Sequence, residues 1–181
     1  MDFLPVAHLK SLYDDPVLVE KLNETIFKSP DWLVMDHGMM SRNDTIQIFC
    51  EREPDLKPEI IHVMQSVDSM FTPKPDSISL LPEIKAAGHK LYYLSNMQNE
   101  IRDYLLVNHD YLKLFDGGVF SCDVKYIKPA PEIYRILINK YDLIPEECLF
   151  FDDMPENVAA AEKEGIKSVL FTTADQIKDY L

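Results

Sequence analysis

The sequence predicts an α/β fold in which a parallel sheet, covered by helices, follows an all-helical unit. Residues 1–72 carry apolar residues at helical spacing and contain no clear strand. A Pro-rich stretch at 72–75 marks a change of pattern, and after it short apolar runs alternate with helical segments. Such alternation is typical of a parallel sheet with helices on both faces. We therefore expect two units, a helical one over 1–72 and an α/β one over 73–181.

Start signals predict the helices of the first unit. Asp15 before Pro16 opens one helix, and Ser29 before Pro30 opens another that ends near Gly38. Two more helices are expected over 41–51 and 58–71, because apolar residues recur there every three to four positions. The first unit should therefore be helical throughout.

The second unit is predicted to alternate between strands and helices. Strands are expected at 90–94, 117–121, 148–151 and 167–171, and helices at 99–107, 131–141, 155–164 and 174–181. A further helix should end at Gly88, with Pro82 making it start late or kink. The carboxyl ends of these parallel strands are where such folds place their ligand sites.

Composition excludes several classes of partner. The 181 residues, 46% hydrophobic and 27% charged, suit a globular protein of one domain with a small appendage. A net charge of −13 argues against nucleic acid or an anionic membrane as partner, but a local lysine and a metal still allow a phosphorylated small molecule. The three scattered cysteines and the lack of a leader pattern or long apolar run favour a cytoplasmic protein. The oligomeric state is not predicted.

Two adjacent carboxylates, Asp152 and Asp153, end the strand expected at 148–151. Adjacent carboxylates repel each other, so a pair at a strand end favours a bound cation, and Mg²⁺ suits oxygen ligands best. The alternative is a helix N-cap with one solvated aspartate, but a cap would need only one of the two.

Two further polar positions fall at the same edge of the predicted sheet. Ser95 and Asn96 follow the strand at 90–94, where a hydroxyl and a backbone N–H can hold a phosphate oxygen, although this pair is also a common helix cap. Lys128 lies in a loop stiffened by Pro129, which would aim its side chain. A lone lysine is most often a solvated charge, so the combination is more specific than any member.

These segments together resemble a known family. L-Y-Y-L-S-N, I-K-P-A-P-E-I-Y and L-F-F-D-D-M-P-E-N-V-A-A-A are similar, in this order, to the second, third and fourth motifs of the haloacid dehalogenase-like (HAD) hydrolase superfamily. The helical segment before them resembles the helical-cap subgroup, and within it the sugar-phosphate phosphatase branch. The resemblance implies a Rossmann-like core, Mg²⁺, and phosphoryl transfer through an aspartyl-phosphate.

The same resemblance implies roles for individual residues. Ser95 and Lys128 would be catalytic, with Ser95 and Asn96 contacting the phosphorylated substrate and Lys128 neutralising developing charge. Asp153 would ligate Mg²⁺, with Asp152 supporting or ligating.

One expected motif is absent. The family's first motif is an apolar strand ending in D-x-D or D-x-G, whose first aspartate is the nucleophile, and it should precede the cap. Asp36 follows Leu33, Val34 and Met35 and imitates it, but the Ser-Pro-Asp start upstream favours a helix there. Since that first strand is central in the family, its absence should leave a gap of about 10 Å between the strands at 90–94 and 148–151. Another segment could fill the gap, or the strands could close up. We favour a sequence that is part of a longer protein.

We therefore expect a Mg²⁺-dependent phosphatase acting on a small phosphorylated metabolite, with this 181-residue chain inactive by itself. One alternative is 2-haloacid dehalogenation on the same fold, which needs no Mg²⁺ and leaves the Asp152–Asp153 pair unexplained. The other is a catalytically silent phosphate-binding or interaction module. Metal dependence and turnover would discriminate among the three.

Overall fold

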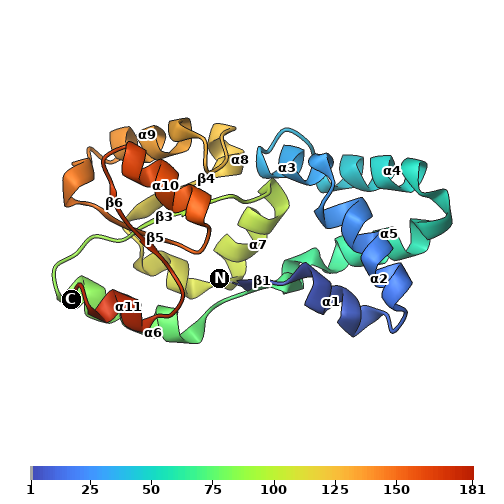
Figure 1. The fold of residues 1–181 in the computed structure, drawn as a ribbon, viewed down its shortest axis with the longest axis horizontal. Helices are drawn as coiled ribbons and strands as arrows, with labels where there is room; N and C mark the ends of the chain where they lie inside the picture. The colour runs from blue at the N-terminus through green and yellow to red at the C-terminus, as the bar shows by residue number, and fades with distance from the viewer. Residues whose placement is uncertain (1) are drawn as a thin grey trace.

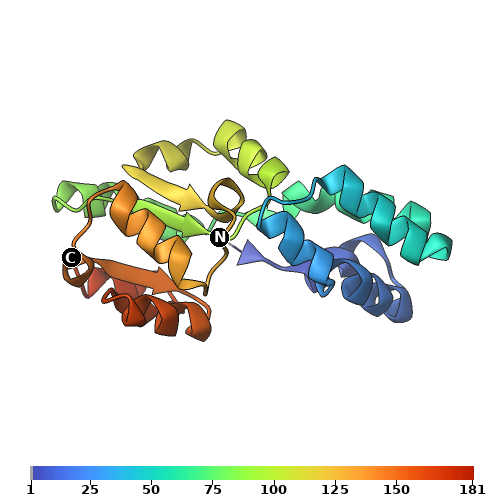
Figure 2. The same cartoon turned by 90° about the horizontal axis from the view of Figure 1, so that it is seen from above.

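A computed structural model describes residues 2–181 of the chain. Two bodies lie side by side in it, a helical one formed by the first part of the chain and an α/β one formed by the rest (Figure 1). We call these the helical unit and the core. Figure 2 shows the strand arrows of the core pointing toward the helical unit, so the carboxyl ends of the strands face the junction. The fold class is α/β with parallel strand pairing, as the sequence predicts.

The helical unit is built from short helices joined by tight turns. In chain order its elements are α1 (Pro5–Leu12), α2 (Pro16–Leu22), the π-helix η1 (Asn23–Phe27), α3 (Pro30–Asp36), α4 (Arg42–Arg52), the 3₁₀ helix η2 (Pro54–Leu56), α5 (Lys57–Ser66) and the 3₁₀ helix η3 (Val67–Met70). The predicted helix starts at Asp15 and Ser29 are confirmed, because these side chains accept hydrogen bonds from backbone N–H groups of the first turns of α2 and α3. Ser41, which was predicted as the first residue of a helix, caps α4 in the same way.

The expectation that residues 1–72 contain no strand is wrong at both ends of the helical unit. β1 (Asp2–Phe3) pairs antiparallel with β2 (Phe71–Thr72) and places the two chain segments next to each other at the junction (Figure 1). The Phe3 ring stacks on the rings of Phe71 and Trp32, with centroids 4.9 and 5.6 Å away. Two-residue strands are too short to produce a periodic pattern in the sequence, so the pairing is seen only in the structure.

The core contains strands and helices in the predicted alternation. Its elements are α6 (Pro75–Ala86), β3 (Tyr92–Ser95), α7 (Asn99–Asn108), the 3₁₀ helix η4 (Asp110–Leu114), β4 (Gly117–Phe120), α8 (Ser121–Val124), α9 (Pro131–Lys140), the 3₁₀ helix η5 (Pro145–Glu147), β5 (Leu149–Asp152), α10 (Pro155–Lys163), β6 (Lys167–Leu170) and α11 (Asp175–Lys178). α6 runs through Pro82 from Pro75, so the expected late start is wrong. The predicted bounds of the other elements differ by a few residues, and α8 was not predicted.

The strands of the core form two separate parallel pairs within residues 2–181. β3 pairs with β4, from Tyr92 opposite Gly117 to Ser95 opposite Phe120, and β5 pairs with β6. β3 and β5 do not pair with each other. The predicted break between them is therefore present, and the alternative in which the two strands close up is wrong.

Helices and apolar side chains hold the two strand pairs in one body. α9 packs on β3 and β4 and also contacts α10, and the buried Ile133 and Tyr134 of α9 share an apolar cluster with Ala161 of α10. A second cluster extends from the helical unit to Ile101 and Leu105 of α7, so the junction between the units is packed. In the part of the chain that the structure describes, no helix has the length and apolar character that a membrane span requires.

Candidate functional site

Lys128 and Asp152 form a buried ion pair at the carboxyl edge of the strands. Lys128 Nζ lies 2.5 Å from Asp152 Oδ2, and the two side chains are only 11% and 5% exposed. The ammonium group also lies 5.6 Å from the centre of the Phe150 ring. Charged side chains are buried this deeply only when they are paired, so each of these residues requires the other. The sequence expectation of an aimed, rather than mobile, lysine agrees with this contact.

The other oxygen of Asp152 is held by the start of α10. Asp152 Oδ1 accepts hydrogen bonds from the Met154 backbone N–H (2.9 Å) and from the side-chain amide of Asn157 (2.8 Å). Asn157 is itself buried, and its carbonyl accepts a hydrogen bond from the Tyr134 hydroxyl, whose pKa burial raises. Asp152 therefore has protein donors on both oxygens. It acts here as the support of Lys128, and the contact of Asn157 was not foreseen, although its place in the first turn after the strand would have allowed it.

Asn96 holds the backbone of the loop that carries Lys128. Its Oδ1 accepts the Lys128 backbone N–H at 2.7 Å, and its Nδ2 donates to the Lys128 carbonyl at 3.0 Å. The side chain thus joins the end of β3 to a residue 32 positions away. Asn96 was predicted to contact substrate; the structure gives it a positioning contact with Lys128, and its second amide N–H and the second lone pair of Oδ1 remain for a ligand.

Ser95 is the last residue of β3 and precedes Asn96, whose two hydrogen bonds to the Lys128 backbone we call the clamp. Ser95 is half-buried, and its hydroxyl has no hydrogen-bond partner among residues 2–181. The contacts of Asn96 and Asp152 with Lys128 bring the loops after β3, β4 and β5 together at one edge. A free hydroxyl and an ammonium group at this edge are the donors that bind phosphoryl oxygens.

Asp153 is the carboxylate at this edge that remains free for a cation. It is exposed, and within the described residues it makes no hydrogen bond or ion pair. Residues 2–181 contain no group of three or more His, Cys, Asp or Glu side chains arranged to hold a metal. Mg²⁺ commonly uses one or two carboxylates and completes its shell with water and phosphate oxygens. The residues therefore fit a Mg²⁺ ion held jointly by Asp153 and a phosphate.

Asp36 lies at the junction rather than at the end of a strand. It is the last residue of α3, which confirms that this segment is helical. The Ser121 hydroxyl donates to the Asp36 carbonyl (2.5 Å) and accepts from the Met97 N–H (2.8 Å), which ties α3 to the ends of β3 and β4. Burial raises the pKa of the Asp36 carboxyl to about 7, and the amide of Gln98 only partly opposes this. Ser121 was not predicted, and no local pattern marks it.

The model of the haloacid dehalogenase-like hydrolase family matches residues 19–165 of this chain, in agreement with the fold and the order of the site loops. The chain belongs to this family of hydrolases.

Individual relatives include phosphatases. The chain is 27% identical over 148 residues to the sesquiterpene phosphatase astK of Aspergillus oryzae, covering 82% of this chain and 76% of that protein. A phosphorylated carbohydrates phosphatase of Thermotoga maritima is 38% identical over 60 residues, which cover 33% of this chain and only 28% of that protein. A HAD family enzyme of Bacteroides thetaiotaomicron, crystallised with magnesium and inorganic phosphate, matches with a TM-score of 0.70 and 18% identity, over 92% of this chain and 84% of that one. The last match shows a shared fold.

Proposed function

We propose that this chain carries the phosphate- and Mg²⁺-binding part of a phosphatase that acts on a small phosphorylated metabolite. The observation that carries the proposal is the fixed position of Lys128, which is held by Asp152 through its ammonium group and by Asn96 through its backbone. A buried lysine held from two sides, beside a free hydroxyl and a free carboxylate, offers separate groups for a phosphate and for a divalent cation.

Each residue has a defined task in this proposal. Lys128 stabilises negative charge on the phosphoryl oxygens, and Asp152 keeps its ammonium group in place. Ser95 donates its hydroxyl to a phosphoryl oxygen. Mg²⁺, when bound at Asp153, supplies a further positive charge near the phosphate. We assign the attacking carboxylate to no residue of 2–181 and therefore expect no turnover from this chain alone.

The helical unit serves as a cap in this proposal. It faces the carboxyl edge of the strands (Figure 2), and Ser121 and Lys125 bond it to the loops beside the site. A cap in that position limits the access of water and contacts the organic part of a substrate. We propose residues 1–72 as this cap and 73–181 as the catalytic core.

One consideration favours a phosphatase over a dehalogenase. The exposed Asp153 beside the buried Asp152 offers a carboxylate to a divalent cation, which dehalogenation does not use. The relatives do not decide between the two reactions, because they include (S)-2-haloacid dehalogenases as well as phosphatases.

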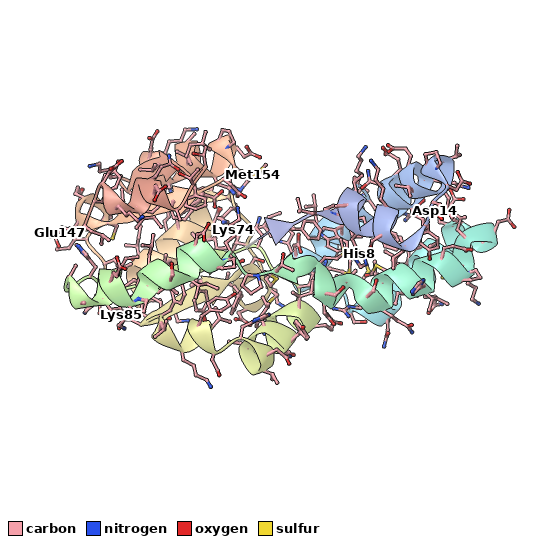
Figure 3. All side chains as sticks on the ribbon, turned by 90° about the horizontal axis from the view of Figure 1, so that it is seen from below. His8, Asp14, Lys74, Lys85, Glu147 and Met154 are labelled. Atoms are coloured by element: carbon pink, nitrogen blue, oxygen red, sulfur yellow. The ribbon has the colours of Figure 1, made fainter. Side chains whose placement is uncertain are left out.

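Binding of phosphate and Mg²⁺ to the purified chain tests the proposal. Isothermal titration should show inorganic phosphate binding that strengthens when Mg²⁺ is present. Asp153→Asn should remove the effect of Mg²⁺, because it removes the free carboxylate. Asp14→Asn, at the far end of the helical unit (Figure 3), is the matched control and should bind both as the parent does. Absence of phosphate binding with and without Mg²⁺ would refute the proposal.

Turnover separates the proposal from its alternatives. With p-nitrophenyl phosphate and Mg²⁺ we expect no hydrolysis above background from the 181-residue chain. Hydrolysis that Asp36→Asn abolishes would instead identify Asp36 as a nucleophile. Binding without turnover fits both this proposal and a silent binding module. To separate them, a segment of a family member that carries the catalytic carboxylate is added, and activity should appear only if the chain is part of a phosphatase.

A further inference from the structure

Four large apolar side chains that are substantially exposed lie on segments bonded to the loops of the candidate site or next to its residues in the sequence. They come from three segments of the chain, and their exposed fractions range from 42% to 65%: Leu33, Met39, Tyr126 and Met154. We call these four residues the apolar rim. Single exposed apolar side chains are common, so their position relative to the site groups is what matters.

Two members of the rim come from the helical unit and face the core. Leu33 lies three and four residues before Asp36 and His37 on α3, which places all three on one face of the helix. That face points at the core, because the His37 ring donates to the Lys125 carbonyl at 2.9 Å. Leu33 is nevertheless 51% exposed, so it lies on the core-facing side of α3 without being covered by the core.

Met39 lies on the same side of the helical unit. It follows Gly38, whose carbonyl accepts a hydrogen bond from Lys125 Nζ at 2.7 Å. The ammonium group of Lys125 also donates to the Cys122 carbonyl at 2.6 Å. Met39 thus follows a residue that is bonded to the segment leading to Lys128, and the ammonium group of Lys125 is already engaged by two backbone carbonyls.

The other two members of the rim adjoin the site residues directly. Tyr126 lies two positions before Lys128. Met154 follows Asp153, and its backbone N–H donates to Asp152. Figure 3 shows Met154 on the part of the core that borders the helical unit. Met154 and Tyr126 therefore lie within two positions, in the sequence, of Asp153 and Lys128, which would hold a phosphate.

We propose that the phosphorylated substrate of this site carries an apolar organic group, such as an aliphatic chain, which packs against the apolar rim. This inference rests on the proposed function, since it concerns the part of the substrate beyond the phosphate. A sugar offers hydroxyl groups that need polar partners, and Leu33, Met39 and Met154 offer none. The proposal departs from the sugar phosphate that the sequence resemblance favours.

Isothermal titration with three probes tests the inference on the chain in the presence of Mg²⁺. Hexyl phosphate, glucose 6-phosphate and inorganic phosphate share the phosphate and differ in the organic part. Each methylene transferred out of water strengthens binding about fourfold, so two buried methylenes already give more than about tenfold. We expect hexyl phosphate to bind at least about tenfold more tightly than inorganic phosphate and glucose 6-phosphate to show no such gain.

Polar variants of similar size locate the effect. Met154→Gln and Leu33→Gln should each weaken the binding of hexyl phosphate severalfold and leave that of inorganic phosphate unchanged. Leu106→Gln is the matched control, because Leu106 is exposed to nearly the same extent as Met154 (48% against 47%) and lies near the opposite end of α7 from the site. It should change neither affinity.

The outcomes separate this inference from the proposed function. If inorganic phosphate binds but hexyl phosphate binds no more tightly than it does, the inference is overturned and the proposed function stands. The same holds if glucose 6-phosphate binds more tightly than hexyl phosphate. Equal weakening of all three probes by Met154→Gln also overturns it, because the side chain would then act on the loop of Asp153. Failure of inorganic phosphate to bind at all overturns both.

Discussion

The carboxyl edge of the strands and the junction with the helical unit each hold an aspartate that is largely removed from water, but in opposite surroundings: Asp152 is buried and Asp36 is half-buried. Asp152 at the strand edge has a lysine ammonium group 2.5 Å away and two hydrogen-bond donors on its other oxygen. Asp36 at the junction has the amide of Gln98 beside it, and burial raises its pKa to about 7. The same residue type thus serves as a permanent partner of a cation in one region and titrates near neutral pH in the other.

The difference shows what burial of a carboxyl group requires. Removing a carboxylate from water is costly, and the protein offsets the cost either with a cation and hydrogen bonds or by keeping the proton on the carboxyl. The first solution suits a binding site, because it holds Lys128 in one place. The second makes the stability of the junction depend on pH. Three predictions test this contrast.

The largest effect is expected from removing the cation. Lys128→Met leaves Asp152 buried without its partner, and we expect the free energy of unfolding to fall by about 3–5 kcal/mol in urea denaturation. Changing both residues, as in Lys128→Met with Asp152→Leu, should recover part of the loss, because no buried charge is then left unpaired.

An exposed ion pair is the control for this prediction. Lys113 pairs with Asp110 on the surface, with side chains 75% and 88% exposed, so Lys113→Ala should not shift the unfolding midpoint measurably. A Lys128→Met variant as stable as Lys113→Ala would show that the buried pair does not hold the site together.

The second effect concerns Asp36 and depends on pH. An unfolded aspartate titrates near pH 4, whereas folded Asp36 keeps its proton up to about pH 7. The folded state binds more protons between these values, so stability should fall as pH rises through this window, by as much as about 4 kcal/mol. Asp36→Asn should remove that fall and be more stable than the parent at pH 8.

Urea denaturation at pH 4 to 8 measures this slope. Asp14→Asn is the control, because Asp14 is exposed and its loss should leave the slope unchanged. A parent protein whose stability does not fall between pH 4 and 7 would contradict the assignment of Asp36.

The smallest effect is expected from the clamp that joins the two sides of the site. Asn96→Ala removes two hydrogen bonds to the Lys128 backbone and should lower the free energy of unfolding by about 1–3 kcal/mol. Asn96→Asp keeps an acceptor for the Lys128 N–H and should also weaken phosphate binding less than Asn96→Ala does. Asn108→Ala, which removes an exposed amide contact with the Tyr104 carbonyl, is the control and should have a smaller effect. Equal losses in the two alanine variants would show that the clamp has no special part in the site.

The local elements and the order of the site loops could be predicted from the residues alone. Caps such as Asp15 and Ser29 act on the first turn that follows them, and apolar spacing over four or more residues distinguishes strand from helix. Parallel strands bring their carboxyl ends to one edge, so Ser95, Lys128 and Asp153 could be placed together before any contact was known.

The contacts of each side chain at that edge depend on how the whole chain is folded. Neighbours in sequence, Asp152 and Asp153 differ because one meets an ammonium group that lies 24 residues away in the chain and the other meets solvent. The clamp of Asn96 spans 32 residues and the bond from Ser121 to Asp36 spans 85. The pairing of β1 with β2 joins opposite ends of the helical unit. Local periodicity reflects the burial of one face of an element, but these contacts depend on how separate elements pack, and that is decided only when the whole chain folds.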